Sequence, residues 1–329
     1  MWCELIVVGS DSAGMQAALT AARAGVRTVV ILPPSDARPT ATQYLAAMEE
    51  LIDRLSSQGP ATRRPTVSAC REIVRRILVR ERQLTERLLE RAGVSTLVGE
   101  WRWRAADRLD VATDGGWQPV EGEKVIVAVG DDFAVPKWAA NRFGGKANEN
   151  VMAIDTVLER AEWPTHAVVV GADQSGTMMA RLLMAVGVEV TMVERRARVA
   201  VPGATVLSPT WGTGLRTDRA GDAAVVTHDG RLVAGDVVVL ATGRQGRAAG
   251  RNFAKLGAKL DAKGRLWCGS NHETVVCGLY ATGAAVAEPT ATNGFDAAVA
   301  ILKDAFPERA AIAATRRGPR LPAGWGVVG

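Results

Sequence analysis

The stretch VVVGADQSG at residues 168–176 decides how this chain folds. An apolar run leads into a glycine turn, and a helical segment follows that ends at Gly187. A second apolar strand at 188–193 then ends on Glu194. This order predicts a βαβ unit with the layout of a dinucleotide-binding fingerprint. It deviates at one position, because Asp173 stands where a glycine would let the backbone approach a pyrophosphate.

The N-terminus repeats both the pattern and the deviation. The stretch LIVVGSDSAG at residues 5–14 leads into a helix, and a strand at 26–32 follows. Two such turns in register, each opening a βαβ unit, indicate the fold strongly. They indicate ligand binding less strongly, because each places a carboxylate where phosphate would lie. The matching positions are Gly9, Asp11, Gly14 and Ala18 in the first turn and Gly171, Asp173, Gly176 and Ala180 in the second.

Composition indicates an ordinary globular protein. A chain of 329 residues is long enough for two domains, and it is 47% hydrophobic and 23% charged. No apolar run is long enough to cross a membrane, and the N-terminus enters a strand without a recognisable signal peptide, so we expect a cytoplasmic location. The net charge of +5 permits acidic ligands without requiring nucleic acid.

The cysteines and histidines predict neither a redox pair nor a metal site. No two cysteines form a C-x-x-C motif, so buried, reduced thiols are the simplest interpretation, although a Cys268–Cys277 pair across a hairpin stays open. The histidines have no metal-ligand spacing with the cysteines. The residues concerned are Cys3, Cys70, Cys268, Cys277, His166, His228 and His272.

Two helices are predicted after the first βαβ unit, at 41–55 and at 67–92, the second ending at Gly93. The second helix alternates arginine with glutamate, which is typical of a solvated face with salt bridges. An anion-binding or protein-partner face on residues 67–92 is the alternative. Its predicted apolar positions are Ile73, Ile77, Leu84 and Leu88.

The segment after this helix alternates tryptophan with arginine over residues 101–104. Such residues can stack on nucleic acid, but in a short strand they more often form one packed face and one wet face. A β-meander is predicted over 108–130, with strands at 109–112 and 117–120 leading into 124–130, and a polar loop at 131–150. Further along, we expect a strand at 236–244, a return segment at 279–284, a helix at 294–302 and a poorly ordered tail at 316–329.

With these motifs in place, the chain resembles the pyridine nucleotide-disulfide oxidoreductases, flavoproteins of the dihydrolipoamide dehydrogenase and soluble transhydrogenase type. The resemblance rests on the twin turns, on KVIVAVG at 124–130, on DVVVLATGR at 236–244 and on LYATG at 279–283. It implies an α/β fold with two Rossmann-like FAD/NAD(P)-binding-type domains, the second inserted into the first. The implied domains are 1–150 plus 266–315 for FAD, 151–265 for NAD(P), and a tail at 316–329.

Several of the family's functional residues are replaced. Residues 33–70 hold no C-x-x-x-x-C pair, so we expect no disulfide chemistry. Leu32 replaces the acid that holds the FAD ribose, and Asp11 replaces a glycine of the FAD turn. Ala284 replaces the aspartate after Gly283. The glutamate near flavin and nicotinamide is replaced as well, by a methionine at position 178, and we expect no C-terminal dimerisation domain. These changes predict that tight FAD binding is lost.

The resemblance also assigns candidate cofactor-binding residues, but no catalytic residue. Glu194 would hold ribose hydroxyls, whereas Arg195 and Arg196 could accept a 2′-phosphate, so NAD and NADP both stay open. The candidates for FAD are Gly9, Ser10, Asp11, Ala13, Gly14, Gly130, Gly283 and Ala284; those for NAD(P) are Gly171, Asp173, Gln174, Ser175, Gly176, Glu194, Arg195 and Gly243.

Two functions follow from these residues. The first is an FAD- and NAD(P)-dependent oxidoreductase that moves hydride without disulfide chemistry. The second is a catalytically degenerate relative that serves as a scaffold, regulatory subunit or nucleotide sensor and has lost FAD binding. An arginine-rich nucleic-acid binder is the least favoured reading. The sequence names neither a substrate nor an oligomeric state.

Overall fold

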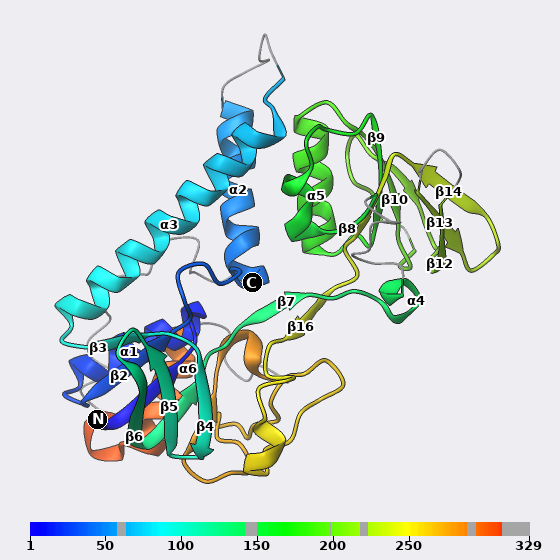
Figure 1. Cartoon of the computed structure of the whole chain (residues 1–329). Helices are drawn as coiled ribbons and strands as arrows, with labels where there is room; N and C mark the ends of the chain where they lie inside the picture. The colour runs from blue at the N-terminus through cyan, green and yellow to red at the C-terminus, as the bar shows by residue number, and fades with distance from the viewer. Residues whose placement is uncertain (58–63, 142–149, 198, 218–222, 288–293, 311–329) are drawn as a thin grey trace. The chain divides into compact units, whose positions relative to one another are not determined.

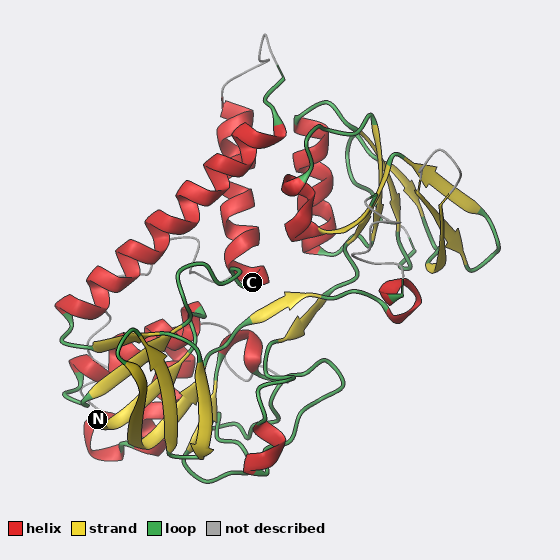
Figure 2. Cartoon of the chain, viewed as in Figure 1, coloured by secondary structure: helices red, strands yellow, loops and turns green. Residues whose placement is uncertain are grey.

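The computed structural model describes residues 1–57, 64–141, 150–197, 199–217, 223–287 and 294–310. The chain divides into two compact units. Unit 1 comprises residues 1–43, 78–132 and 245–329, and unit 2 comprises residues 44–77 and 133–244. Figure 1 labels the elements along the chain, and Figure 2 separates helices from strands.

Unit 1 is built on a seven-stranded sheet in the order β3-β2-β1-β6-β5-β4, with β17 also paired to β6. β1, β2, β3, β6 and β17 are parallel neighbours, whereas β4 and β5 join antiparallel. Parallel strands are buried on both faces, which explains the unbroken valine and isoleucine runs. The strands are β1 (Trp2–Val8), β2 (Thr28–Leu32), β3 (Ser95–Val98), β4 (Trp101–Ala105), β5 (Arg108–Thr113), β6 (Gly116–Val127) and β17 (Leu279–Ala281).

Two helices of unit 1 share a core with this sheet. α1 (Ser12–Arg23) and α6 (Gly294–Ala305) pack together through Met15, Leu19 and Ile301, all fully buried. Helix α1 is followed by Gly25, whose φ of +82° is the left-handed conformation favoured after a helix end. Two short 3-10 helices, η3 (Phe253–Leu256) and η4 (Gly283–Ala285), complete this unit.

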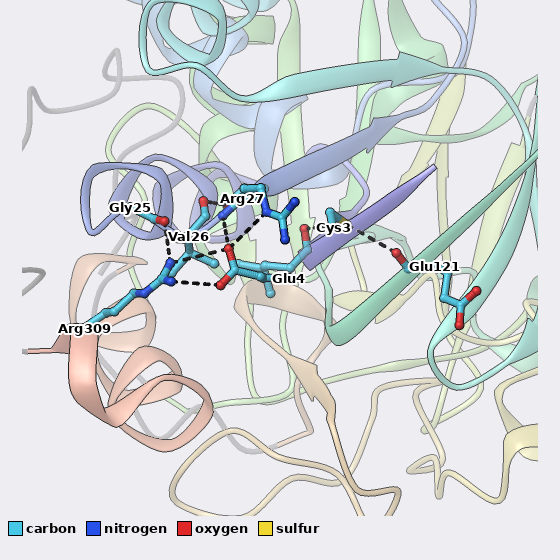
Figure 3. A network of polar contacts seen from close by, with 9 residues as sticks. Cys3, Glu4, Gly25, Val26, Arg27, Glu121 and Arg309 are labelled. Atoms are coloured by element: carbon cyan, nitrogen blue, oxygen red, sulfur yellow. Dashed lines mark hydrogen bonds and ion pairs between the residues drawn. The ribbon is translucent and has the colours of Figure 1, made fainter.

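An ion-pair network ties the residues after α6 to β1 (Figure 3). The Glu4 carboxylate accepts hydrogen bonds from the backbone N–H of Arg27 at 2.8 Å and pairs with the Arg309 guanidinium at 3.1 Å. Arg309 also donates to the carbonyl of Gly25. The Arg27 hydrogen bond is the main cause that lowers the pKa of Glu4. The network therefore anchors the end of the described chain onto the first strand.

Unit 2 has a five-stranded parallel sheet in the order β11-β10-β9-β15-β8. Its strands are β8 (Val151–Ala153), β9 (His166–Val170), β10 (Glu189–Val193), β11 (Thr205–Leu207) and β15 (Val237–Leu240). Helix α5 (Gln174–Ala185) connects β9 to β10 and buries Met179, Leu182 and Leu183. A separate antiparallel sheet contains β12 (Gly212–Thr217), β13 (Ala223–Thr227) and β14 (Leu232–Gly235).

The remaining described elements connect the strands of these sheets along the chain. They are α2 (Ala41–Ser57), α3 (Val67–Arg91), α4 (Lys137–Ala140), η2 (Ile154–Glu159) and the two-stranded sheet of β7 (Asp131–Phe133) and β16 (Arg244–Gly246). The α/β class with two Rossmann-like domains is confirmed, whereas the insertion of the second domain into the first stays a prediction. The domain boundaries stay a prediction, and the tail at 316–329 lies outside the described residues.

Helix α3 has the predicted length, but its buried stripe differs from the predicted one. Leu84 is 36% exposed, whereas Glu81 and Thr85 are buried. The apolar pattern missed this stripe because two of its members are polar. Thr85 satisfies its hydroxyl on the carbonyl of Glu81, and Glu81 pairs with Arg80 at 2.8 Å. The buried positions are Val67, Cys70, Val74, Ile77, Glu81, Thr85 and Leu89.

Three other local predictions need correction. The meander over 109–130 contains one continuous strand, β6, where two were predicted, because Glu121 and Gly122 continue the pairing with β1. The predicted loop at 131–150 contains β7 and α4, and residues 142–149 lie outside the described ones. Cys277 is exposed and not buried, and no Cys268–Cys277 bond forms.

The tryptophan–arginine segment forms β4, with Trp101 buried and Arg102 and Arg104 exposed. Both arginines pair with Asp110 of the neighbouring strand, at 3.0 and 2.6 Å. One packed face and one wet face, as in an ordinary strand, therefore account for this alternation. On α3, Glu72 likewise pairs with Arg75 and Arg76, each at 2.7 Å, which supports the solvated reading of that helix.

Candidate functional site

The first glycine turn brings β1, α1 and β6 into close contact in unit 1. Gly9 has a φ of +114°, and a Cβ atom there would lie 2.1 Å from the carbonyl oxygen of Ala128. A Cβ atom at Gly14 would lie 2.1 Å from the Cβ atom of Ala128. Only glycine fits both places, so both glycines are explained by packing within the fold.

Asp11 occupies the N-terminal end of α1. Its Oδ1 accepts the backbone N–H of Ala13 at 3.1 Å and caps the helix. Its Oδ2 accepts the backbone N–H of Ala284 at 3.1 Å, although the two residues lie 273 positions apart. The carboxylate thus uses two amide donors that a bound anion would otherwise use.

The Asp11 carboxylate is also deeply buried, because the residue is only 4% exposed. Burial is the main cause that raises its pKa to about 6, and the nearby carboxylate of Asp131 adds to the rise. The amide donors of Ala13 and Ala284 oppose it. Gly283 is required beside this group, since a Cβ atom there would lie 2.6 Å from Asp11 Oδ1.

The other candidates of unit 1 lie around Asp11. A Cβ atom at Gly130 would lie 3.7 Å from Asp11 Oδ2 and 2.4 Å from Thr40 Cγ2. The carbonyl of Ser10 accepts the Gln43 side-chain amide at 3.0 Å. Leu32, at the position of the missing ribose acid, is 3% exposed. The structure therefore brings the predicted residues together around a carboxylate.

The second glycine turn has the same close contact in unit 2. A Cβ atom at Gly171 would lie 2.1 Å from the carbonyl oxygen of Ala241, and one at Gly176 would lie 2.0 Å from the Gly171 carbonyl oxygen. Asp173 caps α5 by accepting the Gly176 N–H at 3.0 Å. This side chain is only partly buried.

Glu194, the acid at the end of β10, is 5% exposed and holds the glycine turn in place. Its Oε2 accepts the Ala172 N–H at 2.6 Å. Its Oε1 accepts the backbone N–H of Arg196 at 2.7 Å and the Nε of Arg196 at 2.9 Å. Burial opposes ionisation of Glu194, but the hydrogen bonds from Arg196 and Ala172 hold its pKa below the ordinary value.

Arg195 and Arg196 have different roles although they are adjacent. Arg196 is engaged by Glu194 and also donates to the Ala172 carbonyl at 2.6 Å. Arg195 is exposed and lies over the Trp211 ring, with its central carbon 5.3 Å from the ring centroid. Trp211 in turn stacks on His228, with ring centroids 3.7 Å apart and planes 13° apart.

The remaining candidates of unit 2 are two residues at the start of α5 and a glycine with a left-handed backbone conformation. Gln174 is exposed and Ser175 is buried at the first residues of α5. Gly243 has a φ of +109°, and its carbonyl accepts the Ala134 N–H at 2.9 Å.

The sequence reasoning missed Trp211 and His228. They directly flank the paired strands β12 and β13, where Gly212 lies opposite Thr227. The sequence signal for this pair was a tryptophan directly before one short strand pattern and a histidine directly after the next.

Cys3 and Cys70 are buried and Cys268 is half-buried, whereas Cys277 is exposed. All four cysteines are free. Burial raises the pKa of Cys3 and Cys70 to about 11 and that of Cys268 to about 12. Among the described residues, no three His, Cys, Asp or Glu side chains are placed to hold a metal ion. Within the same part of the chain, no helix is long and apolar enough to span a bilayer.

Comparison with known proteins places these turns in a family. The chain is 22% identical over 315 residues to a soluble pyridine nucleotide transhydrogenase of Vibrio vulnificus, covering 87% of this chain and 66% of the relative. A soluble pyridine nucleotide transhydrogenase of Mycobacterium bovis is 23% identical over 317 residues, with the same coverage. The chain thus spans slightly less than two thirds of the length of these relatives.

Solved structures show the same fold. The HOCl-induced flavoprotein disulfide reductase RclA from Escherichia coli superposes with a TM-score of 0.75 at 17% identity, covering 93% of this chain and 71% of that one. LpdA from Mycobacterium tuberculosis gives a TM-score of 0.73 at 19% identity, with 92% and 72% coverage. The family model described as pyridine nucleotide-disulphide oxidoreductase matches residues 3–305. With its twin glycine turns and parallel sheets, this chain belongs to the pyridine nucleotide-disulphide oxidoreductase family, whose members depend on FAD and NAD(P).

Proposed function

We propose that this chain is an NAD(P)H-dependent oxidoreductase that binds its nicotinamide dinucleotide in unit 2 and does not reduce disulfides. The observation that carries the proposal is the β9–α5–β10 unit, in which Gly171 allows close backbone contact with Ala241 and the Glu194 carboxylate fixes the turn by accepting the Ala172 N–H. Relatives named soluble pyridine nucleotide transhydrogenase support a pyridine nucleotide as the ligand.

In unit 2 the diphosphate would lie at the N-terminus of α5, where the backbone amides and the helix dipole favour an anion. Asp173 weakens this attraction because its carboxylate already accepts one amide there, the N–H of Gly176. Asp173 is only partly buried, so water screens its charge. A bound nicotinamide dinucleotide would supply a hydride.

The cysteines support the exclusion of disulfide chemistry. Disulfide exchange requires an accessible thiolate and a nearby second thiol. Cys70, at the end of the segment 33–70 in which the family's redox pair is expected, is fully buried, and burial raises its pKa to about 11. No second cysteine lies in residues 33–69.

Unit 1 as it stands does not fit FAD. A diphosphate at the α1 N-terminus would meet the Asp11 carboxylate, which already uses the amides of Ala13 and Ala284. Burial keeps water from screening this repulsion. Leu32 offers no oxygen to a ribose. We therefore propose that unit 1 does not retain FAD tightly, and no reaction step is assigned to a flavin here.

Titration calorimetry of the purified protein with NADPH and NADH tests the dinucleotide site. We expect binding of at least one of them, weaker than in a turn without the aspartate. NADPH-dependent reduction of lipoamide and of glutathione disulfide should not exceed that of a heat-inactivated sample. An absorption spectrum taken after incubation with FAD and gel filtration should show no stoichiometric flavin.

The outcomes separate the parts of the proposal. A protein that binds neither dinucleotide would favour the catalytically degenerate reading, in which the fold serves as a scaffold or regulatory subunit. Disulfide reduction above the control would show that cysteines distant in sequence cooperate. Stoichiometric FAD would show that residues other than the turn hold the flavin.

A further inference from the structure

The return segment of unit 1, residues 279–284, is held at two points by buried titratable side chains. At the first point, His272 Nδ1 lies 3.1 Å from the carbonyl oxygen of Ala281, and the Ala281 N–H donates to the His272 carbonyl at 3.0 Å. At the second point, the Ala284 N–H donates to Asp11 Oδ2 at 3.1 Å. A buried base and a buried acid therefore hold the same short stretch of backbone.

His272 reaches this segment through an uncommon backbone conformation. It is 2% exposed, and its φ of +67° lies in the left-handed region that residues other than glycine seldom adopt. Its N–H donates to the Gly269 carbonyl at 3.0 Å, which fixes the backbone on its other side. Because a carbonyl oxygen only accepts hydrogen bonds, Nδ1 carries a proton in the contact with Ala281.

Asp11 and His272 respond to burial in opposite directions, because burial disfavours the charged form of each. Burial is the main cause that raises the pKa of Asp11 to about 6. It is also the main cause that lowers the pKa of His272, against the hydrogen bond to Ala281. The closed return segment therefore favours a protonated Asp11 and a neutral His272, and an opened segment would return both groups to water.

We propose that Asp11 and His272 form a compensated lock on the return segment, in which each side chain offsets the response of the other to pH, so that the segment stays closed across the mildly acidic range. The lock lies within unit 1 and does not depend on the dinucleotide site proposed for unit 2. It holds the segment beside the α1 N-terminus with protein groups alone, at the place where the Asp11 carboxylate repels a diphosphate.

The two contributions have opposite signs. The pKa of Asp11 is raised from 3.8, so its contribution to closure is complete below pH 4 and is lost as the pH rises towards 6. The pKa of His272 is lowered from 6.5, so its contribution is complete above pH 6.5 and is lost as the pH falls. Between pH 4 and 6.5 the closed segment gains from one group what it loses at the other.

The neighbouring titratable groups are of two kinds. Cys268, Tyr280 and Asp304 keep one protonation state in this range: burial raises the pKa of Cys268 to about 12 and that of Tyr280 well above its ordinary value, and the Tyr280 hydroxyl holds the pKa of Asp304 below its own. Asp131 lies near Asp11, and Glu273 directly follows His272. These two carboxylates can add a pH dependence of their own, so the test measures it separately.

Hydrogen–deuterium exchange of the full chain, read by mass spectrometry on a peptide covering residues 276–287, measures the opening. Exchange rates from pH 4 to 6.5 are divided by the intrinsic rate at each pH, which gives the opening equilibrium. In His272→Asn, opening should increase roughly a hundredfold with rising pH, because the titration of Asp11 is then unopposed. Asparagine is chosen there because it tolerates the left-handed conformation.

The other proteins complete a cycle. In Asp11→Asn, opening should increase in the opposite direction, as the pH falls. The pH dependence of the wild type should lie between those of the two single variants and be much flatter than that of His272→Asn. The double variant measures what Asp131 and Glu273 contribute, and its exchange should change little with pH.

Two substitutions in unit 2 serve as matched controls. Asp173 caps α5 as Asp11 caps α1 but is only partly buried, and His228 is exposed. Asp173→Asn and His228→Asn should leave the exchange of the 276–287 peptide unchanged. A peptide that contains β9 is the reference for opening of the whole chain, and circular dichroism checks that each variant is folded.

Three results would overturn the lock. A wild-type pH dependence as steep as that of His272→Asn would show that His272 does not oppose Asp11. A double variant with that same steep dependence would assign the titration to Asp131 or Glu273. Parallel changes in the β9 peptide would show unfolding of the whole chain in place of opening at one segment. If one single variant fails to fold, the sign of the change in the other against the wild type still decides.

Discussion

The two glycine turns of this protein share one sequence pattern but hold their aspartates in different surroundings. Asp11 and Asp173 both cap the helix that follows, as an aspartate at this position does in many helices. Asp173 accepts one local amide and is partly exposed. Asp11 is 4% exposed and accepts a second amide, from Ala284. The same substitution is thus a helix cap in one unit and a buried bridge between distant segments in the other.

This difference teaches that an aspartate in a phosphate-binding turn does not have one fixed effect. A partly exposed carboxylate can be screened by water, and it then only weakens anion binding. A buried carboxylate that satisfies amides from two segments replaces the anion. The two units should therefore respond unequally to changes at corresponding positions.

The largest expected effect is the pH dependence that Asp11 gives to stability. Its pKa is about 6 in the folded protein against 3.8 ordinarily, so the folded state binds more protons between these values. The contribution of Asp11 to the free energy of unfolding is therefore highest below pH 4, where Asp11 is protonated in both states. It falls as the pH rises towards 6, because the buried carboxylate then ionises. The difference of about 2 in pKa corresponds to roughly 3 kcal/mol.

Urea unfolding of the wild type and of Asp11→Asn across this pH range measures the effect. The stability of the wild type relative to the variant should fall by about that amount between pH 4 and 6.5 and then level off. In an Asp131→Asn background the midpoint should move below 6, because Asp131 raises the Asp11 pKa. If the stability difference between wild type and Asp11→Asn did not change with pH, Asp11 would be solvated and not buried.

The next effect concerns FAD. Asp11→Gly frees the amides of Ala13 and Ala284 and removes a buried charge. Hydrogen bonds to a charged group contribute about 1.5–3 kcal/mol each, so FAD should bind roughly a hundredfold tighter than to the wild type. Quenching of flavin fluorescence on titration measures the affinities. Asp11→Asn keeps the side-chain volume, so its gain in FAD affinity should be smaller than that of Asp11→Gly. Equal FAD affinities in all three proteins would contradict the conclusion that Asp11 blocks the amides of Ala13 and Ala284.

A somewhat smaller effect is expected at Gly283. Alanine there must adopt a φ of +64° and place its Cβ atom 2.6 Å from Asp11 Oδ1, so stability should fall by about 2 kcal/mol. Thermal unfolding of Gly283→Ala gives this value. In the double variant with Asp11→Gly the overlap is gone and only the backbone strain remains, so part of the loss should return. Strictly additive losses would show that the two residues do not touch.

The smallest effect is expected from Asp173→Gly in unit 2. Removing one partly screened carboxylate should tighten NADPH or NADH roughly tenfold, as judged by calorimetry. The same variant should leave FAD affinity unchanged, just as Asp11→Gly should leave dinucleotide affinity unchanged. A larger gain in cofactor affinity from Asp173→Gly than from Asp11→Gly would contradict the conclusion that the buried aspartate opposes binding more strongly. If neither the wild type nor Asp173→Gly bound NADPH or NADH detectably, unit 2 would have only a structural role.

The sequence by itself determined the fold class and the positions of the twin turns. Gly9, Gly14, Gly171 and Gly176 recur at fixed spacing because a Cβ atom at any of them would overlap a neighbouring segment. The helix caps at Asp11 and Asp173 were equally predictable, since capping involves residues two or three positions apart. The family resemblance rests on these local requirements.

Only the tertiary structure decided what surrounds each turn. The bond from Ala284 to Asp11 joins segments that sequence spacing cannot relate, and burial of Asp11 depends on packing from several elements. The buried stripe of α3 was misread because Glu81 and Thr85 are polar. The stack of Trp211 on His228 arises from strand pairing between β12 and β13. Local spacing specifies turns and caps, whereas burial, charge pairing and contacts between distant segments depend on how the whole chain packs.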